Sequence, residues 1–137
     1  MLECMILGDS TAIGIAQHKP ECAVIARVGI TSENWYKNFN TNPNTKNNYK
    51  IIVISLGNND YKNTTAESLY NIRKHINADI VFWIAPSLTL KPIQRLLVKE
   101  LANEFKDKVI ESHPYIGYDG IHPNQNGYKQ ISDKIKQ

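Results

Sequence analysis

The sequence lacks most of the features that mark membrane, secreted and nucleic-acid-binding proteins. It has only two cysteines among 137 residues, no apolar run long enough to cross a membrane, and no basic leader followed by an apolar core. The 16 Lys and Arg residues are interleaved with 13 Asp and Glu residues, so the net charge of +3 forms no basic block. We therefore expect a cytoplasmic protein with no membrane span and no nucleic-acid partner.

Patterns typical of metal and nucleotide sites are also missing. No group of His, Cys and carboxylate residues has the spacing of a metal site, and there is no glycine-rich phosphate loop. His18, His75 and His113 fall at a helix end, on a charged helix and in a loop, where surface roles are expected. We predict that the protein uses no metal and no cofactor.

Cys4 and Cys22 both lie inside apolar runs, LECMIL and ECAVIA. A free thiol in such a run behaves as a small hydrophobic side chain, so we expect a reduced and buried pair. A disulfide is geometrically possible if the two runs form neighbouring strands, but it would imply an oxidising compartment. The sequence leaves open whether the two residues are close enough to pair.

Short apolar runs alternate with amphipathic stretches along the whole chain. The runs are rich in Val and Ile and too continuous for half-exposed strands, which indicates a sheet covered on both faces. Strand and helix in alternation predict parallel strands joined by right-handed crossovers. We expect a single domain of the α/β class, a three-layer α/β/α sandwich with a five-stranded parallel sheet. Strands are expected within 2–8, 21–29, 49–57, 78–86 and 107–112, and helices over 11–18, 32–39, 65–76, 92–105 and from 124 onward.

Local patterns add detail to three of these segments. Thr64 and Glu67 have the spacing of a capping box at the start of the 65–76 helix. The polar stretch 40–48 has no periodicity and predicts an exposed loop. In the 92–105 helix one apolar stripe predicts the face that packs on the sheet. The stripe consists of Ile93, Leu97, Leu101 and Phe105.

Polar segments lie where the predicted strands end and before the last predicted helix. In a parallel sheet the carboxyl ends of the strands lie along one edge, and ligands bind there. Each segment alone is also typical of an ordinary turn. Their combination, in this order, predicts a catalytic site. The segments are Gly8-Asp9-Ser10, Gly29-Ile30-Thr31-Ser32, Gly57-Asn58-Asn59-Asp60 and Asp119-Gly120-Ile121-His122-Pro123.

These four segments make the chain resemble the SGNH hydrolases, the serine esterase superfamily also called GDSL, over nearly its whole length. The resemblance implies a flavodoxin-like SGNH hydrolase fold. It implies a Ser10 nucleophile, with His122 as its base and Asp119 as the acid that orients the base. It also implies an oxyanion hole formed by Ser10, Gly29 and Asn59.

The chemistry of acyl transfer explains why these residue types are needed. A serine hydroxyl is a weak nucleophile, so a base within hydrogen-bond reach must take its proton as it attacks. His122 can do this, and Asp119 can hold the imidazole in the right tautomer and stabilise the imidazolium. The N–H groups of Ser10 and Gly29 and the Asn59 amide would face the oxyanion, where losing one donor costs about 3 kcal/mol.

The substrate is less well defined by the sequence. Trp35 and Tyr61 follow closely on the second and third polar segments, so we expect them to line the substrate cleft. The connections are short and contain no inserted lid. This favours an open site that removes small acyl groups such as acetyl from a large alcohol such as a carbohydrate.

Other functions stay open at this point. The resembled family includes acetylesterases acting on polysaccharides and peptidoglycan, and also lipases, lysophospholipases and thioesterases. A lysophospholipase or acyl thioesterase is therefore the alternative function. A non-catalytic binding module on the same fold is disfavoured, because no nucleophile, base or oxyanion donor is missing. The abundance of Asn and Lys agrees with a small genome such as that of a phage.

Overall fold

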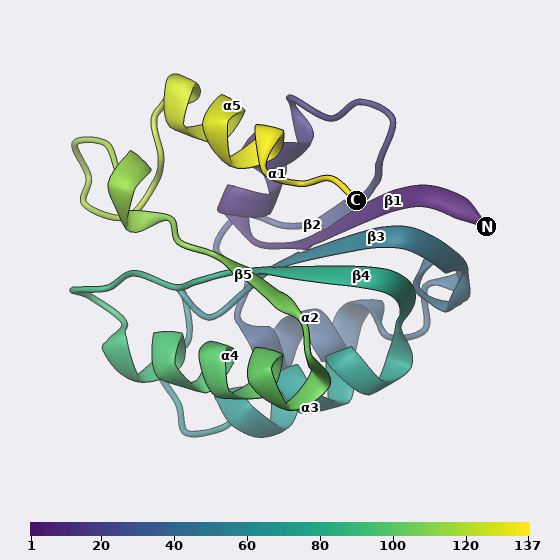
Figure 1. The fold of residues 1–137 in the computed structure, drawn as a ribbon. Coiled ribbons are helices and arrows are strands. Elements are labelled where there is room, and N and C mark those ends of the chain that lie inside the picture. The colour runs from purple at the N-terminus through teal and green to yellow at the C-terminus, as the bar shows by residue number, and fades with distance from the viewer.

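The computed structural model describes all 137 residues and contains one five-stranded sheet (Figure 1). Every pair of neighbouring strands runs parallel. The strands are β1 (Leu2–Gly8), β2 (Ala23–Ala26), β3 (Asn48–Ser55), β4 (Asn77–Ile84) and β5 (Lys108–Ile110). Each lies in or overlaps one of the predicted apolar runs, so the parallel sheet predicted from the alternation of strand and helix is confirmed.

The strand order in the sheet is β2-β1-β3-β4-β5. After β1 the chain moves to β2 on one side, and it then returns to place β3 on the other side of β1. The carboxyl ends of β1 and β3 lie side by side, and the chain leaves them toward opposite faces of the sheet, into α1 (Ser10–Ala16) after β1 and into α3 (Thr65–His75) after β3. The segment that begins with Ser10 and the segment that contains Asn59 follow these two strands directly.

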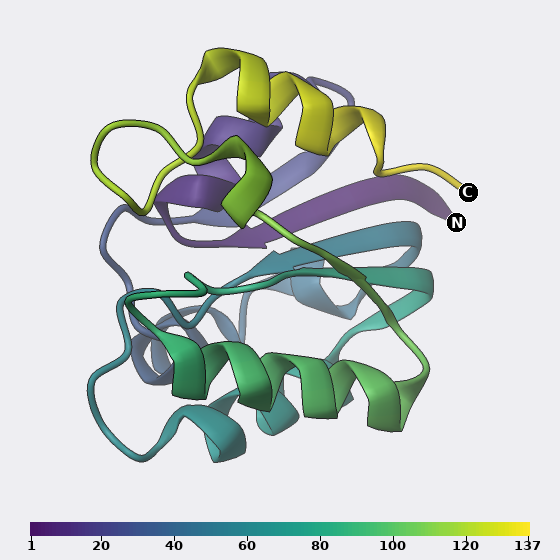
Figure 2. The same cartoon turned by 60° about the vertical axis from the view of Figure 1, so that its left-hand side comes forward.

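Helices cover both faces of the sheet, which confirms the three-layer prediction (Figures 1 and 2). On one face lie α1 (Ser10–Ala16) and α5 (Gln125–Asp133). On the other lie α2 (Ser32–Phe39), α3 (Thr65–His75) and α4 (Pro92–Phe105). The bounds of α2 and α4 are those that the sequence pattern predicts.

The two-sided cover explains why the strands are almost continuously apolar. Successive side chains of a strand point to opposite faces, so β1 contributes Met5 and Leu7 to one core and Ile6 to the other. The first core packs against Trp35 of α2, and the second against Ile15 of α1. All five of these side chains are at most 1% exposed.

A disulfide joins Cys4 to Cys22, with the two Cα atoms 4.7 Å apart. The prediction of a reduced pair is therefore wrong for this structure. Met5 of β1 pairs with Ala23 of β2, so Cys4 and Cys22 occupy the next position back in the same register. The two sulfurs and Glu21 lie close enough to hold a metal ion, but disulfide sulfurs lack the thiolate charge that binds metals.

Helix α4 packs on the sheet through a face that only partly matches the predicted one, since Leu101 of the predicted stripe packs against the core. Its buried residues are Val98 and Ala102, whereas Ile93 is 69% exposed. Two stripes of i, i+4 residues run along this helix. Val98 and Ala102 of one stripe are fully buried, and the other stripe lies at the border of this face.

Two local predictions also differ from the structure. Thr64 makes no capping bond with its side chain, and its hydroxyl donates instead to Glu33 at 3.4 Å. The 40–48 stretch contains a 3₁₀ helix, η1 (Pro43–Lys46), and Thr45 within it is buried. As for membranes, none of the helices combines the length and the apolar character needed to cross a bilayer.

Candidate active site

Ser10, His122 and Asp119 form a continuous chain of hydrogen bonds at the carboxyl edge of the sheet. The Ser10 hydroxyl and His122 Nε2 are 2.8 Å apart, and His122 Nδ1 lies 2.5 Å from Asp119 Oδ2. With the proton on Nδ1 donated to Asp119, Nε2 is left as the acceptor for the serine proton. The structure thus brings Ser10 together with His122, which lies 112 positions further along the chain, and with the neighbouring Asp119.

The segment that carries Asp119 and His122 is held by its own backbone. Ile116 pairs with Pro123 in an antiparallel bridge, and the Gly117 N–H donates to the His122 carbonyl at 2.8 Å. Asp119 Oδ1 accepts the N–H groups of His122 and Ile121 at 2.7 and 2.9 Å. These backbone hydrogen bonds, followed by the bond to the His122 ring, lower the pKa of Asp119 to about 2.

Ser10 is presented by a tight junction between β1 and α1. The Asp9 N–H donates to the Ser55 carbonyl at 3.0 Å, and a Cβ on Gly8 would lie 1.9 Å from that same oxygen. Only glycine fits at position 8 for this reason. Asp9 caps the helix by accepting the Thr11 N–H at 3.1 Å, and Ser10 becomes the first residue of α1. The Ser10 N–H therefore has no partner within the helix.

The Asp9 side chain itself is buried, being 1% exposed. Its Oδ1 accepts the Ser55 hydroxyl at 3.0 Å as well as the Thr11 N–H, while its Oδ2 has no hydrogen-bond partner. Burial raises the pKa of Asp9 to about 6, because removal from water disfavours the charged form more than these bonds favour it.

Gly29 and Asn59 lie on the two loops that follow β2 and β3. Gly29 has a φ of +75°, a conformation that side chains with a Cβ rarely adopt, and its N–H has no hydrogen-bond partner. Asn59 Nδ2 donates one hydrogen to the Ile30 carbonyl at 3.1 Å. Its second amide hydrogen has no partner, so both groups retain a free donor.

Asp60 connects the same two loops to the helices that follow them. Its Oδ1 accepts the Ser32 N–H at 2.8 Å, and its Oδ2 accepts the Thr65 hydroxyl at 2.7 Å. Ser32 and Thr65 are the first residues of α2 and α3. One buried carboxylate thus sets the relative position of the Gly29 and Asn59 loops.

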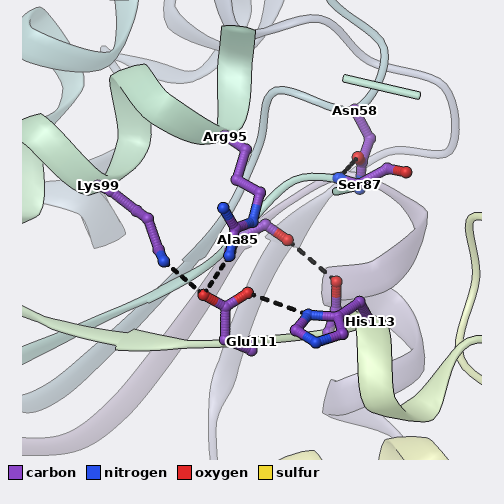
Figure 3. A network of polar contacts seen from close by, with 8 residues as sticks. Asn58, Ala85, Ser87, Arg95, Lys99, Glu111 and His113 are labelled. Atoms are coloured by element: carbon purple, nitrogen blue, oxygen red, sulfur yellow. Dashed lines mark hydrogen bonds and ion pairs between the residues drawn. The ribbon is translucent and has the colours of Figure 1, made fainter. Parts of the chain in front are cut away.

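The loop between β4 and α4 also holds the Asn59 segment. Asn58 Oδ1 accepts the Ser87 N–H at 2.8 Å, as Figure 3 shows. The Lys91 ammonium donates to the Asp60 carbonyl at 2.7 Å, and Gln94 donates to it at 3.4 Å. The sequence carries no local signal for these contacts, because they join residues about thirty positions apart.

A second polar cluster lies where β5 ends and the chain turns toward the segment with Asp119. Arg95 and Lys99 of α4 both contact Glu111 Oε1 at 2.6 Å, and His113 lies 3.3 Å from its other oxygen (Figure 3). Partial burial alone would raise the pKa of Glu111, but the bonds from Arg95 and Lys99 outweigh it and lower the pKa to about 2. The hydroxyl of Ser112 donates to the Ala85 carbonyl at 3.0 Å and fixes the same corner.

The two residues predicted to line the substrate cleft have different environments. Trp35 is 1% exposed and donates through Nε1 to the Ile25 carbonyl at 2.9 Å, so it belongs to the core and the prediction for it is wrong. Tyr61 is 74% exposed and borders a polar hollow beside Asp60, where a substrate contact stays a prediction. His18, His75 and His113 are exposed, as predicted.

Known proteins similar to this chain are found by comparison of structures and not by comparison of sequences. No family model matches the sequence, and no curated protein matches it. The catalytic C-terminal domain of the Streptococcus pneumoniae peptidoglycan O-acetyltransferase OatA is similar with a TM-score of 0.66 at 19% identity, over 96% of this chain and 89% of that one.

Two further solved structures extend this likeness. A putative acylhydrolase from Bacteroides fragilis matches with a TM-score of 0.70 at 16% identity, over 96% of this chain and 83% of that one. A carbohydrate esterase of family 3 from Talaromyces cellulolyticus matches with a TM-score of 0.59 at 16% identity, over 97% and 93% of the two chains. At identities this low, structural similarity shows the fold alone. The chain has the SGNH hydrolase fold.

Proposed function

We propose that residues 1–137 form a single catalytic domain, a serine esterase that hydrolyses short-chain acyl esters through an acyl-enzyme. The observation that carries this proposal is the continuous hydrogen-bond chain from Ser10 through His122 to Asp119. The loops that follow β2 and β3 carry the Gly29 N–H and an Asn59 amide hydrogen without partners, and in our proposal these donors form the electrostatic site for the oxyanion.

The first half of the reaction acylates Ser10. Its Oγ attacks the acyl carbonyl carbon as His122 Nε2 takes the hydroxyl proton, and Asp119 stabilises the imidazolium that results. The carbonyl oxygen becomes an oxyanion that accepts hydrogen bonds from the Ser10 and Gly29 N–H groups and from Asn59 Nδ2. His122 then returns the proton to the leaving alcohol oxygen, the C–O bond to that alcohol breaks, and the acyl group remains on Ser10.

The second half frees the enzyme with water as the nucleophile. His122 takes a proton from the water as its oxygen attacks the acyl carbon, and the same donors hold the second oxyanion. The proton passes to Ser10 Oγ as the acyl–serine bond breaks. The products are a carboxylic acid and the unmodified enzyme.

We propose an acetyl or similarly short acyl group, esterified to a carbohydrate, as the substrate. The hollow beside Asp60 and Tyr61, next to Asn59 in the chain, is lined mainly by polar side chains and offers no apolar channel for a long hydrocarbon chain. The similarity to a peptidoglycan O-acetyltransferase domain and to a carbohydrate esterase supports the same choice. A lysophospholipase or thioesterase would need an apolar channel for its acyl chain.

The test is hydrolysis of p-nitrophenyl esters of increasing acyl length by the purified protein. We expect the rate to be highest for acetyl and to fall beyond butyryl, and we expect Ser10→Ala to abolish it while thermal unfolding is unchanged. Ser68→Ala, the same change at a buried serine of α3, is the matched control and should keep full activity. Preference for long chains would favour the lipid or thioester alternative, and hydrolysis by Ser10→Ala would contradict the proposed nucleophile.

A cytoplasmic location and a phage-like origin stay predictions, and the Cys4–Cys22 disulfide bears on the first of them. Disulfides persist in oxidising compartments and are rare in the cytosol. Alkylation of free thiols at the moment of cell lysis, followed by mass spectrometry, decides the matter for the producing cell. Two alkylated cysteines would agree with the cytoplasm, and an intact bridge would contradict it.

A further inference from the structure

A fully exposed tyrosine lies next to Asp119, the acid of the proposed triad of Ser10, His122 and Asp119. Tyr118 directly precedes Asp119, and its relative exposure is 112%, the largest among the large hydrophobic side chains. Ile116 and Pro123 close the base of the loop, so its shape does not depend on packing of the Tyr118 ring. In Figures 1 and 2 this loop, between η2 (His113–Tyr115) and α5, projects at the carboxyl edge of the sheet.

An open hollow of about 620 Å³ lies on the same loop. Its lining includes Tyr118, Asp119 and His122, together with Ile116 and Asn124. Asn124 Oδ1 accepts the Gly127 N–H at 2.8 Å, while its amide N–H groups have no partner. The hollow thus combines an aromatic face with unused polar groups and borders the histidine of the triad.

The reaction geometry decides which part of a substrate this hollow can receive. The acyl oxygen must face the donors of Gly29 and Asn59, whereas the leaving alcohol oxygen must reach His122 Nε2 to take up the proton. Asp119 and Tyr118 belong to the same loop as His122. The hollow therefore lies on the alcohol side of the reacting carbon.

We propose that this hollow is the subsite for the alcohol part of the substrate and binds a sugar ring against Tyr118, which rests on the esterase function proposed above. A pyranose presents C–H groups on its face and hydroxyls around its rim. An exposed aromatic ring with adjacent hydrogen-bonding groups is complementary to both. A simple alkyl alcohol would use neither the polar rim of the hollow nor the extent of the ring.

The experiment compares two acetyl esters that differ only in the alcohol, methyl 6-O-acetyl-glucopyranoside and ethyl acetate. The measured quantity is the ratio of their kcat/KM values. We expect Tyr118→Ala to lower this ratio by about five- to tenfold, and Tyr118→Phe, which keeps the ring, to restore it to within about twofold of the wild-type ratio. Tyr70→Ala removes a partly exposed tyrosine of α3 outside both hollows and should leave the ratio unchanged.

An unchanged ratio in Tyr118→Ala, or an equal loss for both esters, would overturn the subsite. If the wild-type protein hydrolyses neither ester, the esterase proposal fails for acetyl groups. The subsite is then tested by whether the protein binds the sugar. Saturation-transfer NMR of methyl glucopyranoside with the Ser10→Ala protein then gives the answer. Saturation-transfer signals on the ring C–H protons that disappear in the Ser10→Ala, Tyr118→Ala double variant support the subsite. Absence of any signal with the Ser10→Ala protein overturns it.

Discussion

Asp119 holds His122 at two points, because one of its oxygens accepts the His122 backbone N–H at 2.7 Å and the other lies 2.5 Å from Nδ1 of the ring. The same carboxylate therefore shapes the loop and orients the imidazole. Its pKa of about 2 means that it stays ionised at any pH at which the protein would be assayed. Loss of activity in mild acid must then come from protonation of another group.

Two substitutions separate these roles of Asp119. Asp119→Asn keeps an oxygen for the backbone N–H groups but presents an amide N–H to Nδ1, which favours the tautomer that cannot accept the Ser10 proton. We expect kcat to fall by about 10⁴-fold, with thermal unfolding nearly unchanged. Asp119→Ala loses both contacts and should lower kcat and also loosen the loop, seen as faster amide exchange at Ile121. An unchanged kcat in Asp119→Asn would place the acid elsewhere.

Asn59 and Asn58 form a natural pair for testing the oxyanion hole. Asn59→Ala removes the proposed oxyanion donor and should lower kcat by about 10²- to 10³-fold with little change in KM. Asn58→Ala removes only the acceptor for the Ser87 N–H and should cost much less. Steady-state kinetics on the best p-nitrophenyl ester give both values. A larger loss for Asn58→Ala would reverse the assignment of the two residues.

Lys91 acts on the site through the carbonyl of Asp60, the residue that follows Asn59. Lys91→Met keeps the length of the side chain and removes the hydrogen bond, so the Asn59 amide should become less well placed and kcat should fall about tenfold. Lys99→Met in α4, whose ammonium contacts Glu111 instead, is the control. In an Asn59→Ala background Lys91→Met should have little further effect on kcat. Full additivity would show that Lys91 acts independently of Asn59.

Asp9 makes the stability of the protein depend on pH. Its pKa is raised from 3.8 to about 6 in the folded state, so between these values the folded protein binds more protons than the unfolded chain. Stability from this group is present below pH 4 and is lost as pH rises through 6, by about 3 kcal/mol.

The comparison of wild type with Asp9→Asn isolates that contribution. Asparagine keeps an oxygen for the Thr11 and Ser55 donors but cannot ionise. The free energy of unfolding of the variant relative to wild type should therefore increase from pH 4 to pH 7. Chemical denaturation across this range measures it, and a difference independent of pH would show that Asp9 titrates normally.

The Cys4–Cys22 bridge lies at the end of β1 opposite to Ser10 and closes a loop with a sequence separation of 18. Reduction should lower the free energy of unfolding by about 3 kcal/mol, because the unfolded chain regains the freedom of that loop. Ester hydrolysis at 25 °C should persist. Denaturation with and without reductant tests this, with the Cys4→Ser, Cys22→Ser double variant as the control that reductant must not affect. Loss of activity on reduction without unfolding would contradict it.

The sequence predicts well wherever the signal is local. The apolar runs identify all five strands because both faces of the sheet are buried, and the end of each run marks where a polar segment emerges. Ser10, Gly29 and Asn59 lie in segments that follow strands, and such segments meet at one edge of a parallel sheet. Asp119 and His122 instead precede the last helix, and the roles of all five residues came from the resemblance to the SGNH hydrolases and stay predictions.

Predictions that depended on the environment of a side chain fared worse. Trp35 lies near the second polar segment in sequence, yet its position on α2 turns the ring into the core. The face of α4 and the pairing of Cys4 with Cys22 depended in the same way on which of several neighbours the packing selects. The spacing of residues along the chain does not predict which neighbours a side chain packs against.

The sequence by itself determined the alternation of strands and helices, and with it the edge of the sheet along which the polar segments after the strands lie. Only the tertiary structure decided the contacts made across that edge. Lys91 on the Asp60 carbonyl, Asp60 between two helix starts and the buried carboxylate of Asp9 all join residues from separate segments. Hydrogen bonds and burial act through space over a few ångströms, whereas a sequence pattern reports only neighbours along the chain.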